Sequence, residues 1–447
     1  MSLKALIQVT NFDEILRRVF LRNKNEIKKA IKDPNFNWLG RKPFIGDFIK
    51  HLQNQTRSVH ICINGVWGSG KTTTIMGIMD RLDKIDEGIK PLVLYLDAWK
   101  YEHYQDPLFA LLKVMQKELP EIFKIIMSDI QKNGIEPQVG LNLPFLNIAM
   151  SKNRDDTYNR LLNESEYIDA LNEIMITAVK KFKEERSNEL IIFIDELDRA
   201  KPDFALRTME MFHHLQDELP THIVYSVDMT QLSSIVKHYY GYEYNVEIFT
   251  HKVFDEIVSL KKLTKNEIES YIDEKLISFS IGYSIPNIRN LIMKYMGLDQ
   301  LESLRTLNRI CKSITQKLQT GYFKRTNRGF IMNRYYLGND SNLWGYVEFL
   351  VILEVFSLTD PMKVYEFLRG ENIIELLNFI LEKEQGNSNE ELGSLIEKSY
   401  NGDKNNETNL SYLDLNNEEK IIGIKRLFAP ITEDFESTSV FSSGELF

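Results

Sequence analysis

One octapeptide constrains this chain more than any other segment. Residues 65–72 read GVWGSGKT and fill the pattern G-x-x-x-x-G-K-[ST] at every required position, directly after the apolar run 59–63. Glycines are needed there because backbone N–H groups must wrap around a polyphosphate, and side chains would block that approach. Residues 72–82 have apolar side chains at helical spacing, so the positive N-terminal end of that helix would face the phosphates. The segment therefore predicts a phosphate-binding α/β fold.

Individual residues of this loop have expected roles. Lys71 would bring its charge to the β- and γ-phosphates, and Thr72 would offer its hydroxyl to Mg²⁺. Trp67 either stacks on the base or packs the loop against the next strand, and we favour packing. The predicted nucleotide-contacting residues are Gly65, Val66, Trp67, Gly68, Ser69, Gly70, Lys71, Thr72, Thr73, Ser226 and Arg305.

A second half of the site is predicted about 120 residues later in the chain. The apolar run 190–194 leads into Asp195, Glu196 and Asp198, as expected for a buried strand of a parallel sheet with carboxylates at its ligand-binding end. Asp195 is the predicted Mg²⁺ partner, and Glu196 the group that polarises the attacking water. Asp198 is the second candidate for that role. Acidic residues after a strand also commonly cap the following helix. We therefore interpret this acidic group as a metal site only because the glycine loop is present in the same chain.

Catalysis of phosphoryl transfer also requires positive charge near the developing negative charge. The catalytic set predicted from the sequence is Lys71, Glu196, Asp198 and Arg199. Ser226 or Asp228, at the end of another apolar run, would sense the position of the water. The candidates for an added cation are Arg199, Lys252, Arg305 and Arg309.

Composition limits the classes of partner and compartment. The net charge of −9 gives no global reason to bind nucleic acid, although the basic segments 17–32 and 324–328 leave local phosphate contacts open. Two cysteines, Cys62 and Cys311, provide neither a disulfide framework nor a zinc site, which fits a reducing cytosol. No apolar stretch is long enough to span a bilayer. We expect a cytoplasmic, soluble protein.

The 447 residues exceed the usual size of one hydrophobic core, so several domains are expected. We predict a helical lead-in at 1–37, a nucleotide core at 38–260 with a helical insertion at about 103–189, a helical lid or C-terminal domain at 261–385, and a polar, partly flexible region at 386–447. Within the insertion, 134–150 should form a loop or short hairpin. The predicted strands are 59–64, 91–97, 190–194 and 222–227; the later predicted helices are 204–215, 265–275, 303–319 and 343–356.

These motifs together resemble the KAP P-loop NTPases, a branch of the additional-strand ATPases related to the STAND regulators. The loop is similar to that family's G-x-W-G-S-G-K-[ST], including its tryptophan. Residues 97–102 resemble N-A-W-x-Y-E with Asp97 in place of Asn, and 190–202 resemble the D-D-L-D-R-x-x-P stretch with Glu196 in place of the second Asp. Residues 303–309 match the P-R-x-x-x-R-x-x-N helix loosely, which makes Arg305 and Arg309 candidates for sensing the γ-phosphate.

The resemblance implies a P-loop NTPase core with a parallel sheet sandwiched by helices, and an ATPase that uses ATP and Mg²⁺. Many family members have transmembrane helices between the two nucleotide motifs, and this chain has none there. That difference favours a soluble KAP protein of the kind associated with phage exclusion or defence, acting as a homo-oligomer or with an effector partner. A guanine-reading N-K-x-D is absent, since 264–267 read TKNE. The alternative is a nucleotide-gated switch or scaffold with little hydrolysis.

Overall fold

The computed structural model describes residues 24–34, 36–86, 90–104, 106–132, 135–137, 160–162, 164–186, 189–215, 221–276, 285–296, 303–319, 323–326, 329–332, 335–338 and 340–369. The chain divides into two compact units, Met1–Lys261 and Lys262–Phe447, which we describe separately. The strands of the first unit are β1 (His60–Asn64), β2 (Leu92–Asp97), β3 (Ile135–Pro137), β4 (Arg160–Leu162), β5 (Leu190–Asp195), β6 (Thr221–Val227) and β7 (Glu256–Ser259). Its helices are α2 (Arg41–Gln53), α3 (Lys71–Leu82), α4 (Ala98–Tyr101), α5 (Pro107–Glu118), α6 (Pro120–Lys132), α8 (Glu164–Arg186), α9 (Pro202–Leu215), α10 (Met229–Tyr240) and α11 (Val246–Val253), with short 3₁₀ turns η1 (Glu102–Tyr104) and η2 (Leu197–Arg199).

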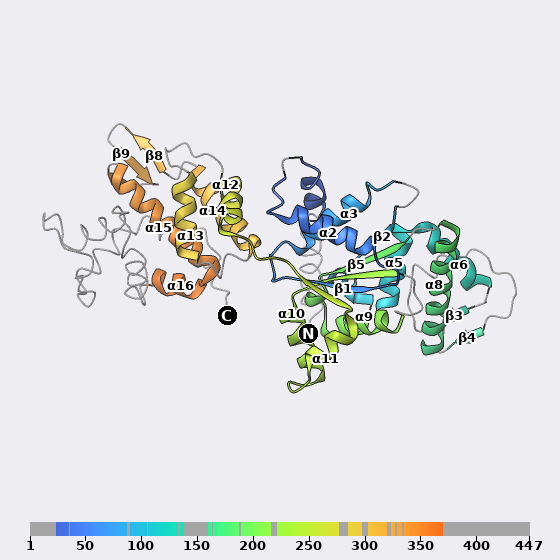
Figure 1. Ribbon diagram of the computed structural model, residues 1–447. Helices are drawn as coiled ribbons and strands as arrows, with labels where there is room; N and C mark the ends of the chain where they lie inside the picture. Colours follow the sequence, from blue (N-terminus) through green and yellow to red (C-terminus); the bar gives the residue numbers. More distant parts are fainter. Residues whose placement is uncertain are drawn as a thin grey trace. The chain divides into compact units, whose positions relative to one another are not determined.

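Five strands of the first unit form a parallel sheet in the order β2-β5-β6-β1-β7, and Figure 1 labels β1, β2 and β5 in this sheet. Strand β6 therefore lies between β1, which leads into the glycine loop, and β5, which ends in the acidic residues. Because all five strands run in the same direction, their carboxyl ends share one edge of the sheet, and this edge is where ligands of open α/β sheets bind.

Alternating side chains of each strand fill two separate cores, one on each face of the sheet. Ile61 of β1 and Phe193 of β5 pack with α2 and α3 on one face. Cys62 and Ile192, one residue away in each strand, pack with α5, α9 and α10 on the other. Helices thus cover both faces (Figure 1), which explains why the strands are apolar throughout rather than alternating with polar residues.

Gly77 brings α3 close to Trp38. A Cβ built at position 77 would lie 2.6 Å from Trp38 Cη2 and 2.9 Å from Ile45 Cδ1, both in the packed layer on this face. Gly77→Ala is expected to destabilise the protein by about 1–3 kcal/mol, because overpacking forces neighbouring side chains to move. Urea unfolding measures this. Gly46→Ala in α2 is the matched control, since its Cβ would meet only the flexible end of Arg81, and an unchanged stability for both variants would contradict the packing.

His60 opens β1 and makes the stability of this unit depend on pH. Its side chain is 1% exposed, and burial lowers its pKa from 6.5 to about 4 against the opposing effect of Asp255. Between those two values the unfolded chain binds a proton that the folded chain does not, so stability falls as the pH falls. From about pH 7.5 to about pH 5 the expected loss due to His60 is about 2 kcal/mol.

Urea unfolding of His60→Gln at both pH values tests this assignment. The variant should show a smaller loss of stability on acidification than the wild type, because it has no imidazole to protonate. His238→Gln, at an exposed position, is the control. It should lose as much stability on acidification as the wild type does. Identical pH dependence in wild type and His60→Gln would show that His60 does not carry it.

The structure confirms the fold class and the four strands predicted for the core. The strands predicted at 59–64, 91–97, 190–194 and 222–227 are β1, β2, β5 and β6, and the helix predicted at 204–215 is α9. Strand β7 was not expected. The described parts of the insertion are mostly helical, as predicted. The loop or hairpin at 134–150 falls largely outside the described residues; the part that is described, β3, pairs with β4 in parallel and so does not form a hairpin with it.

The second unit contains more than helices. Its helices are α12 (Lys265–Lys275), α13 (Ile285–Met296), α14 (Leu304–Gln319), α15 (Asp340–Thr359) and α16 (Pro361–Arg369). Strands β8 (Phe323–Thr326), β9 (Gly329–Met332) and β10 (Tyr335–Gly338) form an antiparallel sheet that the sequence analysis did not predict, although most of the described residues of this unit are helical. Strands of four residues give too little alternation to be recognised in the sequence. The polar region 386–447 lies outside the described residues.

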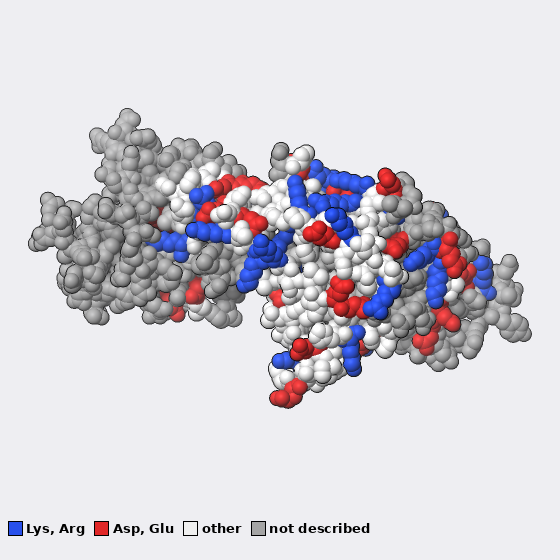
Figure 2. All heavy atoms as spheres, in the orientation of Figure 1, with Lys and Arg blue, Asp and Glu red and all other residues white. Residues whose placement is uncertain are grey.

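Charged side chains on the face seen in Figure 2 are of mixed sign over the first unit. Near α3, for example, Lys84 pairs with Asp80 at 2.6 Å and Lys90 with Asp83 at 2.8 Å. The figure therefore adds no support for a nucleic-acid surface. Within the described part of the chain, no helix combines the length and the apolar character that crossing a bilayer requires.

Candidate nucleotide site

The glycine loop connects β1 to α3 and leaves the start of that helix open. Gly68 and Gly70 have φ angles of 87° and 91°, values that a residue with a Cβ rarely adopts. No side chain caps the first turn of α3, which contains no acidic residue. The buried Ser69 hydroxyl has no hydrogen-bond partner among the residues that the structure describes, and a Cβ at Gly65 would lie 2.7 Å from it. The backbone N–H groups at the start of α3 and the Ser69 hydroxyl could therefore donate hydrogen bonds to an anion, as a polyphosphate site requires.

Lys71 joins this loop to the acidic strand. Its ammonium donates to the carbonyl oxygens of Gly65 at 2.6 Å and Val66 at 3.4 Å, and lies 3.9 Å from Asp198 Oδ2. Burial lowers the pKa of Lys71, while the nearby carboxylates, first that of Asp198, oppose the shift. Thr72 and Thr73 are half-buried in the first turn of α3.

Asp195 ends β5 and is held from two sides. Its Oδ2 accepts the hydroxyl of Tyr95 at 2.7 Å, and its Oδ1 accepts the backbone N–H of Glu196 at 3.0 Å. Tyr95 belongs to the neighbouring strand β2. The sequence analysis did not include Tyr95; its position two residues before Asp97, on the same face of the strand, was the available signal.

Glu196 adopts a strained backbone conformation directly after the strand. Its φ of 60° and ψ of 25° are left-handed, which costs a non-glycine residue about 1 kcal/mol. The carboxylate forms an ion pair with Arg199 at 2.5 Å and is largely buried. Burial first, and Asp195 second, raise the pKa of Glu196 from 4.5 to about 7, against the charge of Arg199. A carboxylate of this pKa suits proton transfer near neutral pH.

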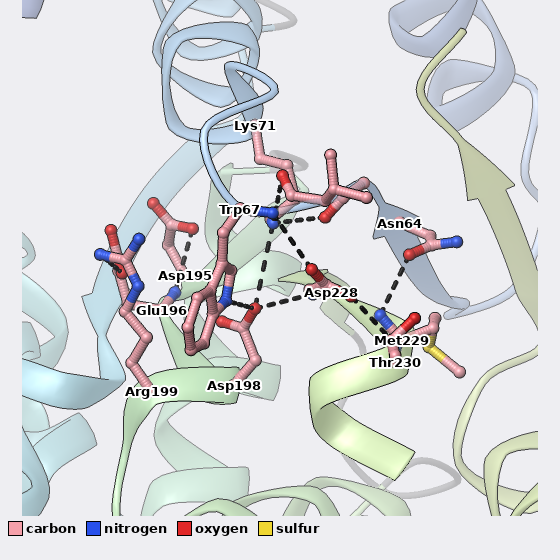
Figure 3. A network of polar contacts seen from close by, with 12 residues as sticks. Asn64, Trp67, Lys71, Asp195, Glu196, Asp198, Arg199, Asp228, Met229 and Thr230 are labelled. Carbon is pink, nitrogen blue, oxygen red and sulfur yellow. Dashed lines mark hydrogen bonds and ion pairs between the residues drawn. The ribbon is translucent and has the colours of Figure 1, made fainter. Parts of the chain in front are cut away.

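Asp198 forms hydrogen bonds that connect the glycine loop to the end of β6 (Figure 3). Its Oδ2 accepts the Trp67 indole N–H at 2.7 Å and the Asp228 backbone N–H at 2.8 Å. Asp228 in turn accepts the Trp67 backbone N–H at 3.1 Å and caps α10 through Thr230. These contacts favour a role for Asp198 in fixing the glycine loop. The indole packs under Arg199, whose guanidinium carbon lies 5.4 Å from the ring centroid.

The remaining predicted residues lie in different places. Ser226 is fully buried beside Asp195, in register with it across β5 and β6, and within the described part of the chain its hydroxyl has no hydrogen-bond partner. Lys252 is exposed on α11. Arg305 and Arg309 are exposed on α14 of the second unit, so their roles remain predictions.

The segment 264–267 has a structural explanation. Thr264 caps α12 by accepting the N–H of Glu267, and the Glu267 carboxylate accepts the N–H of Thr264 at 2.7 Å. Both side chains form the hydrogen bonds that cap the N-terminus of α12. No guanine-reading role is assigned to them.

The residues present fit ATP with Mg²⁺. Among the described residues, no group of three or more His, Cys, Asp and Glu side chains could hold a metal by itself. Mg²⁺ in nucleotide sites takes one or two protein ligands together with phosphate oxygens and water. Thr72 and Asp195 would provide those ligands, and the uncapped start of α3 would receive the phosphates.

This fold and site define a P-loop nucleotide-binding protein. Residues 41–320, more than half of the chain, match the model of the KAP family P-loop domain. The chain therefore belongs to the KAP family of P-loop NTPases, and this membership supports nucleotide binding. No curated protein matches the chain.

Solved structures with similar folds include three archaeal proteins. The Walker-type ATPase of Pyrococcus abyssi has 17% identity over 63% of this chain and 67% of its own, with a TM-score of 0.33. Cdc6p from Pyrobaculum aerophilum has 12% identity over 66% and 67%, with a TM-score of 0.38. The Aeropyrum pernix ORC2 protein has 12% identity over 89% and 88%, with a TM-score of 0.38. The assignment rests on the family match.

Proposed function

We propose that this protein binds ATP with Mg²⁺ and hydrolyses it. The observation that carries the proposal is the convergence of the two motifs: Lys71 of the glycine loop lies 3.9 Å from Asp198 of the acidic segment. Such a convergence brings phosphate-binding and metal-binding groups to one edge of the sheet. Lys71 would neutralise the β- and γ-phosphates, while Thr72 and Asp195 would hold Mg²⁺. When bound, Mg²⁺ supplies further charge neutralisation at the phosphates.

Glu196 is the residue we assign to the attacking water. Its carboxylate follows Asp195 directly and forms an ion pair with Arg199. If Arg199 moves away, the Glu196 carboxylate can accept a proton from water. Arg199 would then be free to approach the transferring phosphoryl group, where a cation stabilises the transition state. Ser226 is buried beside Asp195, and none of the described residues forms a hydrogen bond with its hydroxyl, so we assign it to contact with the water or the γ-phosphate.

Phosphate release by the purified protein tests the proposal. We expect release from ATP that needs Mg²⁺, stops with excess chelator, and is not suppressed by equal concentrations of GTP. Release that continues without any divalent cation would contradict the assigned metal site, because Asp195 and Thr72 would then have no role in turnover.

A nucleotide-gated switch is the second candidate function, and the Arg199–Glu196 ion pair is the observation that favours it. While Arg199 holds one oxygen of the Glu196 carboxylate, Glu196 would be a poorer acceptor for a water proton, so the protein could bind ATP and change conformation with little turnover. ATP binding without phosphate release, in the presence of any required partner, would select this candidate.

The cellular role that we propose is based on the resemblance to soluble KAP proteins. It is an ATP-dependent contribution to phage exclusion or defence, made as a homo-oligomer or through an effector protein. Phage plating on bacteria expressing the wild-type chain or Lys71→Ala tests this. Protection by the wild type alone is expected, and equal plating on both would contradict the role.

A further inference from the structure

Lys24 approaches the nucleotide site from the N-terminal segment. It belongs to the helical residues 24–30. Ile27 of this helix and Ile31, which directly follows it, pack against the core on the α2 and α3 face of the sheet. The spacing 24, 27, 31 puts Lys24 on this same inward face. Its ammonium forms an ion pair with Asp97 and lies 5.2 Å from the centroid of the Tyr95 ring.

Burial distinguishes Lys24 from an ordinary lysine of a solvated helix face. The side chain of Lys24 is 13% exposed and that of Asp97 is 12% exposed. A pair so far removed from water is screened less by salt than a surface pair, and removal of one partner leaves the other charge uncompensated. Lys28, one turn further along the same helix, is exposed and provides an internal comparison.

Both groups that Lys24 touches surround the candidate metal ligand. Asp97 ends β2 in register with Asp195 at the end of β5, so two carboxylates lie side by side, and Glu196 follows as a third. Tyr95 donates its hydroxyl to Asp195 at 2.7 Å. An uncompensated Asp97 at this edge would repel a triphosphate and compete with Asp195 for a cation.

We propose that Lys24 is a positioning residue of the nucleotide site, which neutralises Asp97 and packs over Tyr95 so that Asp195 is the carboxylate left to Mg²⁺. This inference rests on the proposed function. It also extends the site beyond the family-matched region, since Lys24 lies outside residues 41–320. The N-terminal segment then contributes to nucleotide binding as well as to packing.

A double-mutant cycle tests the inference in the full-length protein. Titration calorimetry gives the dissociation constant for ATP with Mg²⁺, and melting of the nucleotide-free protein reports folding. Lys24→Met is expected to weaken binding about tenfold, because one negative charge is left beside the phosphates. On an Asp97→Asn background the same change should alter binding by less than about twofold, since no charge remains to be compensated.

Two further variants separate positioning from packing. Lys24→Arg keeps the charge and should bind within about threefold of wild type, whereas Lys28→Met, the matched control, should not change binding. If Lys24→Met does not fold, the comparison of Asp97→Asn with the double variant decides, because the double variant is predicted to fold and to bind as Asp97→Asn does.

The contrary results are distinct. If the wild type binds ATP with Mg²⁺ and Lys24→Met binds it equally well, this inference is wrong but the proposed function stands. The inference would also be overturned if Lys24→Met weakened ATP binding equally in the wild type and in Asp97→Asn. Lys24 would then affect binding independently of Asp97. Failure of the wild type to bind ATP with Mg²⁺ would remove the proposed function, and this inference with it.

Discussion

Replacement of Lys71 by alanine is expected to weaken the binding of ATP with Mg²⁺ by about a hundredfold or more, the largest effect on affinity that we predict for a single residue. Its ammonium lies within the glycine loop, bonded to the Gly65 carbonyl at 2.6 Å, where a polyphosphate would replace that carbonyl as its partner. Titration calorimetry measures the loss. Phosphate release should disappear in parallel.

Lys84 provides the matched control for this change. It lies just after the C-terminal end of α3, with an exposed side chain paired to Asp80. Lys84→Ala removes the same charge from the same unit, and affinity should remain that of the wild type. Equal affinities of Lys71→Ala and wild type would mean that the loop does not bind the phosphates.

Glu196→Gln should lower the rate of phosphate release by about a hundredfold or more while ATP affinity stays within about threefold of wild type. The amide cannot accept a proton from water, but it keeps the size of the side chain. The change leaves Arg199 without its carboxylate partner, but it also removes the repulsion from Asp195 that, with burial, raises the pKa of Glu196, so we expect the fold to tolerate it. Single-turnover phosphate release and calorimetry on the same samples separate rate from affinity.

Glu247→Gln is the control for an acid-to-amide change, since the Glu247 side chain is 82% exposed on α11. Its phosphate release should match that of the wild type. If Glu196→Gln keeps full turnover, another group activates the water. If both turnover and affinity are lost, Glu196 acts in binding, and the role assigned here is wrong.

The sequence was sufficient to predict the core of the fold. Continuous apolar runs such as 190–194 identify strands buried on both faces, and the octapeptide 65–72 requires a strand before it and a helix after it. Strand β7 was missed because its four residues alternate in burial next to a single neighbouring strand, β1, which gives a weak pattern. The strands β8, β9 and β10 were missed for the same reason of length.

The candidate site was predicted less completely than the fold. Motif spacing predicted Lys71, Asp195 and Glu196 as site residues, because the chemistry of phosphates and Mg²⁺ favours those residue types, and their roles stay predictions. It did not show that Asp198 binds the Trp67 indole, since that contact joins residues 131 positions apart. Nor did it show that Lys24 pairs with Asp97, 73 positions away. Such contacts depend on how the elements pack, which local patterns do not encode.

Titration calorimetry of the wild-type protein with ATP, with and without Mg²⁺, tests the central claim most directly. The account predicts a saturable heat of binding for a single site per chain when Mg²⁺ is present, much weaker when a chelator removes it, and lost in Lys71→Ala. No heat with ATP and Mg²⁺ at any accessible concentration, or the same heat in Lys71→Ala, would contradict the site at the carboxyl edge of this sheet.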